Sequence, residues 1–241
     1  TLPLDTCDSD TQGGMGYMLQ QVLGNELRRL HLDRPVVTLI TQVVVDAGDP
    51  AFRRPTKPIG PFYTKADAEE RRSRFGWDLV EDAGRGWRRV VPSPRPQEIV
   101  ELEAIRRCLR SGIVCIAVGG GGIPVRRLPD GELRGCEAVI DKDRSSALLA
   151  RQLQADLFLI ATAVDRVCLD YRQPTQRALD RLSAEQARAL LAQGQFPPGS
   201  MGPKIEAALE FLAGGSGEVI ITSPEHVLDA LEGRSGTRIV P

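Results

Sequence analysis

The strongest constraint on the fold is a regular alternation of apolar strand-like runs with amphipathic helical segments. The run PVVTLITQVVVD (residues 35–46) is rich in β-branched residues and almost wholly apolar, as is typical of a strand covered on both faces of a parallel sheet. Apolar residues at helical spacing predict a helix over residues 12–30 before it. Further helices are expected at 98–110, 143–154, 184–193, 204–212 and 224–232, and strands at 113–118, 137–140, 157–162, 167–170, 218–222 and 237–240. This pattern predicts an α/β protein, a three-layer αβα sandwich with a mostly parallel central sheet.

Residues 47–96 interrupt this alternation. The segment is rich in proline and charge and contains one short helical patch at 66–74. It is too long for a plain connection between two elements of a compact domain. We therefore expect residues 1–241 to form one αβα domain and residues 47–96 to be an inserted, small, protruding subdomain.

The composition of the chain limits which partners it is expected to bind and in which cellular compartment it is expected to lie. The net charge of −1 and the pI of about 6.2 give no electrostatic footprint for nucleic acid or an anionic membrane. The chain has no apolar run of the length that spans a bilayer, roughly 18 residues. The five cysteines lack any CxxC spacing, so a zinc site or disulfide framework is not expected, and the reducing cytoplasm fits best. Because the chain has two histidines, a Ser-His-Asp triad or a His-rich metal centre is not expected.

Four consecutive glycines, residues 119–122, follow the predicted strand 113–118. Open α/β sheets bind ligands at the carboxyl ends of their strands, and glycine lets a ligand approach the backbone closely. The motif is weak by itself, because it is neither GxGxxG nor GxxxxGK[ST]. A dinucleotide fold is therefore disfavoured, and an ordinary P-loop is excluded.

Three lysines stand out by their context. Lys57 lies in the stiff, proline-flanked segment PTKPIG, Lys142 in VIDKD between a predicted strand and helix, and Lys204 in GSMGPK at a predicted helix start. A helix N-terminus preceded by small residues binds anions readily. A lone lysine is more often a solvated surface charge, and Asp141 and Asp143 could equally be helix-start carboxylates. These patterns alone predict an αβα protein that binds an anion or a phosphate.

Several longer motifs make the sequence similar to a known family. They are PLDTC (3–7), QGGMGY (12–17), TQVVVD (41–46), RPTKPIGPFYT (54–64), EDAGRGWRRVVPSP (81–94), GGGGIPV (119–125), EAVIDKD (137–143) and GSMGPKIEAA (199–208). Together they run through nearly the whole chain and resemble the carbamate kinases of the amino acid kinase family. The combination of TKPIGPF, EDAGRGW and AVIDKD is specific to that group within the family.

The resemblance implies phosphoryl transfer between ATP and carbamate, giving ADP and carbamoyl phosphate, with Mg²⁺ accompanying the nucleotide. By matching motifs, Lys57 would reach the carbamoyl phosphate, Lys142 and Asp143 would face the transferred phosphoryl group, and Lys204 would contact the nucleotide's terminal phosphates. The three lysines would then act on one migrating phosphoryl group. The substrate would lie on Gly119, Gly120 and Gly121, and the nucleotide pocket would be lined by Thr162, Ala163, Val164, Gly199, Ser200 and Met201. No protein metal ligands are implied. A homodimer, a cytoplasmic location and a role in arginine metabolism are the further expectations.

Two glycine-rich units that open relatives of this group, GGNA and GNGPQVG, do not occur in the sequence. The domain is therefore expected to be N-terminally incomplete. Two other functions stay open on this basis. One is a truncated, non-catalytic remnant that binds nucleotide or carbamoyl phosphate, and the other is a kinase of the same family that acts on a different small acid.

Overall fold

The computed structural model describes residues 2–82, 84–197 and 199–241. The chain divides into two compact units, residues 1–142 and 143–241. None of the described helices is long and apolar enough to cross a membrane.

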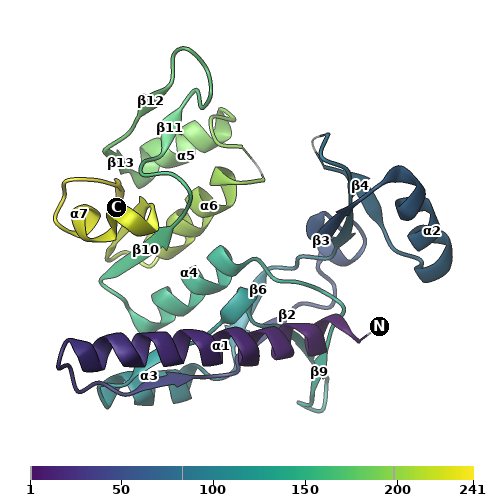
Figure 1. Ribbon diagram of the computed structural model, residues 1–241, viewed down its shortest axis with the longest axis horizontal. Helices are drawn as coiled ribbons and strands as arrows, with labels where there is room; N and C mark the ends of the chain where they lie inside the picture. Colours follow the sequence, from purple (N-terminus) through teal and green to yellow (C-terminus); the bar gives the residue numbers. More distant parts are fainter. Residues whose placement is uncertain (1, 83, 198) are drawn as a thin grey trace. The chain divides into compact units, whose positions relative to one another are not determined.

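The first unit is built on two sheets that contain parallel pairs. Strands β1 and β7 pair in parallel, and a second sheet has the order β6-β2-β8-β9, in which β2 and β8 are parallel. Helix α1, the long purple helix of Figure 1, packs against β1, β7 and β8. The bounds are α1 Leu4–Arg29, β1 Val36–Thr38, β2 Gln42–Val45, β6 Pro96–Ile99, α3 Leu102–Arg110, β7 Val114–Ile116, β8 Ile123–Arg127 and β9 Leu133–Gly135.

The predicted strand over residues 35–46 is two strands. β1 pairs with β7, whereas β2 pairs with β8, and the chain changes partner over residues 39–41. The turn between them is fixed by the Thr41 hydroxyl, which donates to the Leu39 carbonyl oxygen at 2.7 Å. The run gives no clear sign of such a break, because residues 36–46 contain no glycine or proline and both strands are rich in valine.

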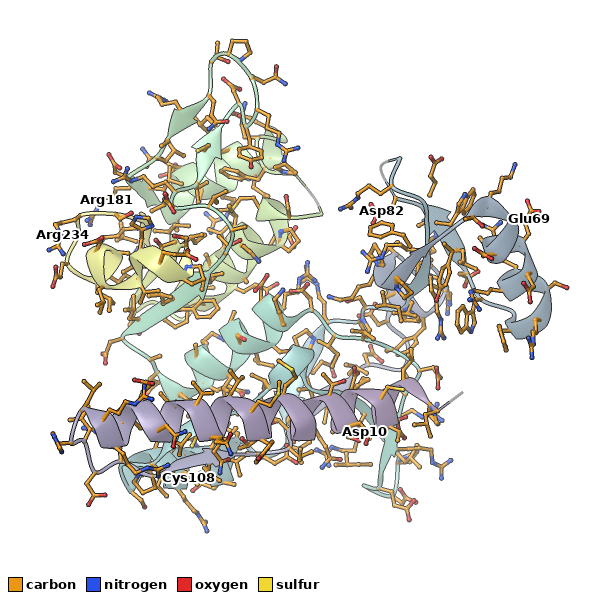
Figure 2. The ribbon with its side chains drawn as sticks, in the orientation of Figure 1. Asp10, Glu69, Asp82, Cys108, Arg181 and Arg234 are labelled. Carbon is orange, nitrogen blue, oxygen red and sulfur yellow. The ribbon has the colours of Figure 1, made fainter. Side chains whose placement is uncertain are left out.

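Residues 57–91 form a sheet of their own. Antiparallel strands β3 (Lys57–Tyr63), β5 (Trp87–Val91) and β4 (Leu79–Glu81) pair in the order β3-β5-β4, accompanied by helix α2 (Lys65–Phe75) and preceded by the 3₁₀ turn η1 (Pro50–Phe52). Helix α2 begins with a capping box between Thr64 and Asp67 and ends at Gly76 in the left-handed region. Figure 2 shows how densely this lobe carries side chains, with Glu69 on α2 and Asp82 beyond β4 labelled. Its treatment as a subdomain spanning residues 47–96 stays a prediction.

Arginine–aromatic stacks supply much of the packing in this lobe. The Arg89 guanidinium lies 4.6 Å from the centre of the Trp77 ring, and the Arg71 guanidinium lies 4.3 Å from the Tyr63 ring. The Trp77 ring also stacks on Phe75. Cations over aromatic faces are attracted by the ring quadrupole, so these contacts add to a small apolar core.

The second unit has a four-stranded sheet in the order β10-β14-β15-β13. Strands β10 and β14 are parallel over five residue pairs, from Leu157 opposite Glu218 to Ala161 opposite Thr222. Phe158 of β10 and Phe211 of α6 pack together in the core of this unit, with ring centroids 5.6 Å apart and the ring planes tilted by 51°. The bounds are α4 Lys142–Leu153, β10 Leu157–Ala161, β11 Cys168–Leu169, β12 Arg177–Ala178, β13 Arg181–Ser183, α5 Ala184–Ala192, α6 Met201–Leu212, β14 Glu218–Thr222, η3 Pro224–His226, α7 Val227–Leu231 and β15 Thr237–Val240.

The α/β class predicted from the sequence is confirmed, with differences in detail. Helix α1 begins at Leu4 rather than at residue 12, since Glu137 accepts the Leu4 N–H at 3.1 Å and Asp5 lies in the favourable first turn. The expected strand 137–140 is wrong. Residue 137 lies in a bend, Val139 N–H donates to the Pro92 carbonyl oxygen, and residues 137–140 join no ladder among the described residues. The strands fall into several sheets within the described residues, and not into one.

Candidate functional site

Lys57 and Asp141 form an ion pair within the first unit. The Lys57 Nζ lies 3.0 Å from Asp141 Oδ2, and both side chains are about three-quarters buried. Lys57 is the first residue of β3, whereas Asp141 directly precedes α4, so the pair connects the predicted insertion to the segment that carries Lys142. Asp141 therefore contacts Lys57, a predicted site residue. The sequence had not decided between such a contact and a simple helix-start carboxylate.

The glycine loop lies against the same segment. Gly119–Gly121 form the 3₁₀ turn η2, and Gly120, Gly121 and Gly122 have φ values of +66°, +122° and +85°. A Cβ on Gly121 would overlap the Ile140 carbonyl oxygen and lie 3.3 Å from the Lys142 backbone nitrogen. Gly121 is therefore glycine both for its conformation and because the chain passes directly over residues 140–142. The structure thus brings the glycine loop to the backbone of Lys142, whose neighbour Asp141 binds Lys57.

Two polar residues behind the loop were missed by sequence reasoning. Gln12 is 5% exposed and Thr41 is fully buried, and their hydrogen bonds lead to the loop. Gln12 lies within the predicted helix, and nothing in the sequence distinguishes it as buried from the solvated polar residues beside it. Thr41 is likewise hidden inside an apolar run.

The second unit contains the other predicted pair. Lys204 Nζ lies 2.9 Å from Asp143 Oδ2, with side-chain exposures of 13% and 11%. Asp143 lies in the first turn of α4 and Lys204 in the first turn of α6. A second ion pair between the same helices, Arg144 with Glu206, holds them in register.

The start of α6 depends on Gly202. Its N–H donates to the Pro197 carbonyl oxygen at 2.9 Å, and a Cβ there would lie 3.0 Å from the same oxygen. Helix α6 consequently begins at Met201, three residues earlier than predicted. Lys204 is therefore inside the first turn. The backbone there offers little to an anion, because the Ser200 and Gly202 N–H groups both donate to the Pro197 carbonyl oxygen and Pro203 has no N–H.

The residues predicted to line the nucleotide pocket lie at two element ends of this unit. Thr162 follows β10, and its N–H donates to the Thr222 carbonyl oxygen at 2.8 Å. The carboxyl end of a parallel strand is where ligands of α/β sheets bind. Gly199 and Ser200 are exposed before α6, and Met201 is half-buried as its first residue. Ala163 is exposed and Val164 half-buried after β10, and Pro198 of the same predicted motif lies outside the described residues.

Lysine is rare in this chain. Only four of the 31 lysine and arginine residues are lysines, namely Lys57, Lys65, Lys142 and Lys204. Arginine serves for nearly every other cation, and the two residues are not interchangeable, because a lysine ammonium is a compact point charge whereas the arginine guanidinium is a planar fork. This bias is a sequence feature that marks the three candidate lysines more strongly than their local context does.

Near Lys57, the carboxyl group of Asp8 has an unusual environment. The pKa of Asp8 is raised from 3.8 to about 6, first by burial and second by the nearby Asp5 carboxylate, while Lys57 opposes the shift. Its Oδ2 is buried and accepts no hydrogen bond among the described residues. No cluster of His, Cys, Asp or Glu suited to hold a metal ion occurs in the described parts of the chain.

Comparison with known proteins identifies the family of the chain. Residues 43–223 match the model of the amino acid kinase family. The chain is 50% identical to the carbamate kinase-like protein YahI of Escherichia coli and 46% identical to a carbamate kinase of Pyrococcus furiosus, in each case over 99% of this chain and 75% or 76% of the relative. Among solved structures, carbamate kinase from Giardia lamblia bound to AMP-PNP matches with a TM-score of 0.89 and 43% identity, over 99% of this chain and 76% of that one.

The chain therefore belongs to the amino acid kinase family. Its relatives within that family include carbamate kinases of Pyrococcus furiosus and Enterococcus faecalis, and the chain belongs with the carbamate kinases. It spans about three-quarters of the length of these relatives.

Proposed function

We propose that this protein is an ATP-dependent carbamate kinase that transfers a phosphoryl group between ATP and carbamate. The observation that carries the proposal is that three of the chain's four lysines lie at the predicted phosphate sites, two of them in buried ion pairs. Carbamate is already an anionic nucleophile, so the reaction needs no side-chain base. Phosphoryl transfer then rests on alignment and on neutralisation of the phosphoryl oxygens.

Each lysine has a distinct proposed role. Lys57 binds carbamoyl phosphate, Lys142 stabilises the charge on the transferred phosphoryl group, and Lys204 binds the terminal phosphates of the nucleotide. Carboxylate partners hold Lys57 and Lys204 in fixed positions before substrate binds. Preorganised cations of this kind avoid reorganisation during the reaction and contribute strongly to catalysis.

The glycine loop would bind the small, highly charged substrate through its backbone. Gly119, Gly120 and Gly121 carry no side chains that would block the approach of a substrate, and the left-handed φ values of Gly120 and Gly121 exclude most other residues. The Gly121 N–H itself donates to the Val118 carbonyl oxygen at 3.0 Å. The loop lies against the Lys142 backbone. Substrate on the loop would therefore be close to the chain segment that carries the proposed charge-stabilising lysine.

Magnesium would enter with the nucleotide as the Mg²⁺–ATP or Mg²⁺–ADP complex. Mg²⁺ keeps several waters and is usually bound by substrate phosphates with one or two carboxylates. Asp143 is the carboxylate placed beside the proposed phosphate-binding Lys204. The nucleotide itself would bind at Thr162, Ala163, Val164, Gly199, Ser200 and Met201.

A homodimer in the cytoplasm, serving arginine metabolism, completes the proposal. Helix α1 supports the dimer, since Met15, Met18, Leu19 and Val22 recur at helical spacing and are each about half exposed. Exposed apolar stripes of this kind mark interaction surfaces. Light scattering of the purified protein, compared with a Leu19→Asp, Val22→Asp variant, tests this part by its molar mass.

Two measurements test the enzymatic proposal. Luciferase-coupled detection of ATP formed from ADP and carbamoyl phosphate should show turnover, and isothermal calorimetry should show binding of both ligands. Binding without ATP formation would support the alternative of a non-catalytic remnant. A panel of acyl phosphates separates carbamate from other small acids, and equal turnover with acetyl phosphate would contradict the proposed substrate.

A further inference from the structure

Gln12 is a buried polar residue to which the reaction proposed above assigns no role. Its side chain accepts the Thr41 N–H at 2.8 Å and donates to the Thr41 carbonyl oxygen at 3.1 Å. The carboxamide thus takes the place that a neighbouring strand would occupy, at the point where the chain changes partner between β1 and β2. A buried amide with both functions satisfied fixes a local backbone conformation.

Thr41 in turn holds both ends of the glycine loop. Its hydroxyl accepts the Val118 N–H at 3.0 Å, and its carbonyl oxygen accepts the Ile123 N–H at 2.9 Å. The loop between these two anchors contains all four glycines. Gln12, through Thr41, therefore acts on the position of the whole loop.

The loop needs such support. Val118 has φ +49°, in the left-handed region that a β-branched residue adopts at a cost. Strained residues of this kind persist only where the surroundings over-determine them. Gln12 also packs against the loop directly, because a Cβ on Gly119 would lie 3.3 Å from its Cγ.

We propose that Gln12 is a positioning residue for phosphoryl transfer, holding the glycine loop through Thr41. The proposal rests on the function proposed above, because it assumes that the loop binds the reacting substrate. It predicts that removal of the Gln12 carboxamide lowers kcat by more than the accompanying loss of stability explains. Misplacement of a substrate-binding group by about 1 Å can cost up to about 100-fold in rate.

Helix α1 offers a matched control. Gln20, two turns further on, accepts the Thr38 N–H at 2.8 Å, which is the same kind of bond to β1 but without a link to the loop. Gln12→Met and Gln20→Met each remove a carboxamide that bonds a backbone N–H. Both should lower the melting temperature, whereas only Gln12→Met should lower kcat, by about 10- to 100-fold.

Amide hydrogen exchange tests the positioning without relying on activity. In Gln12→Met the amides of residues 118–123 should exchange faster than in the wild type, and in Gln20→Met they should not. Thr41→Val should reproduce the Gln12→Met result, and Thr41→Ser, which keeps the hydroxyl, should restore both exchange and kcat. Thr41→Val, which leaves the Gln12 carboxamide in place and removes only the hydroxyl that accepts the Val118 N–H, serves where Gln12→Met does not fold.

The results separate the two proposals. If the wild-type protein shows no phosphoryl transfer, the proposed function is contradicted. The hydrogen-exchange comparison would still decide whether Gln12 positions the loop. Unchanged exchange at residues 118–123 in Gln12→Met, or a kcat that falls no further than in Gln20→Met, would overturn the role of Gln12.

Discussion

Lys204 donates to Asp143 across 2.9 Å, joining the first turn of α6 to the first turn of α4. Both side chains are nearly nine-tenths buried, so the ammonium is held before any phosphate arrives. A lysine fixed at a helix start adds a point charge at the positive end of the helix dipole. This pair is the feature of the second unit most directly suited to a nucleotide phosphate.

Removal of the Lys204 ammonium should weaken nucleotide binding. Lys204→Met is expected to raise the KM for ADP and to lower kcat/KM by about 100-fold, as for loss of one electrostatic group at a reacting centre. Steady-state kinetics with varied ADP checks this. The matched control is Lys65→Met, since Lys65 is exposed on α2; equal kinetics in the two variants would contradict the assignment.

Asp143→Asn tests whether the carboxylate orients the lysine. The substitution keeps the shape but removes the charge that holds Lys204, so kcat should fall while the melting temperature drops modestly. Breaking a buried pair by removing one partner leaves the other charge uncompensated, which costs about 3–5 kcal/mol when burial is complete and less here. A variant with reduced stability but unchanged kcat would limit Asp143 to a structural role.

Lys57 should affect the other substrate. Lys57→Met is expected to raise the KM for carbamoyl phosphate at least tenfold, about 1.4 kcal/mol in binding, and to leave the KM for ADP nearly unchanged. Lys57→Arg keeps the charge but replaces a point charge by a planar fork, and it should recover binding only in part. A change confined to the KM for ADP would show that Lys57 has been assigned to the wrong substrate.

Gly119→Val should lower kcat strongly while it changes the melting temperature only slightly. The Cβ would lie 3.3 Å from Gln12 Cγ, so the valine methyl groups press on the residue that supports the loop and also cover its backbone. The control is Gly14→Ala, at an open position on α1. An unaltered melting temperature together with a near-normal rate in Gly119→Val would refute this account of the glycines.

Asp8 should give the protein a pH-dependent stability. Its folded-state pKa of about 6 lies above the ordinary 3.8, so the folded chain binds its proton more tightly than the unfolded chain does. This contribution is present below about pH 4 and is lost as the pH rises through 6. The stability gained by Asp8→Asn should therefore be larger at pH 7.5 than at pH 4.5 in urea unfolding.

The control for that comparison is Asp10→Asn, because Asp10 is exposed on the same helix and is labelled in Figure 2. Its effect should change little between the two pH values. A gain from Asp8→Asn that is equal at both pH values would show that the carboxyl group titrates normally in the folded chain.

The sequence predicted the elements whose periodicity is strong. Strand β14 and strand β15 lie where the sequence analysis expected them, and helices α5 and α4 differ by a residue or so. The small strands β3, β4 and β5 were not predicted, because proline, charge and aromatic residues obscure alternation there and arginine–aromatic contacts do part of the packing. Pairing changes such as that between β1 and β2 depend on tertiary hydrogen bonds, which leave no trace in composition.

Site residues could be predicted from the sequence where their residue type and motif point to phosphate binding. The motifs indicated Lys57, Asp143 and Lys204, and the structure gives two of them the carboxylate–ammonium contact within one unit. The partner of Lys57 could not be foreseen, since Asp141 is 84 positions away and equally plausible as a helix-start carboxylate. Gln12 and Thr41 act only through backbone contacts, so residue type alone gives no indication of them.

The most direct test of the account is the rate at which the wild type and Lys142→Met form ATP from ADP and carbamoyl phosphate, with Lys65→Met as the reference. The account predicts clear turnover in the wild type and Lys65→Met, and a kcat lower by about 100-fold or more in Lys142→Met at similar melting temperature. No ATP from the wild type, or equal rates in all three proteins, would contradict lysine-stabilised phosphoryl transfer by this chain.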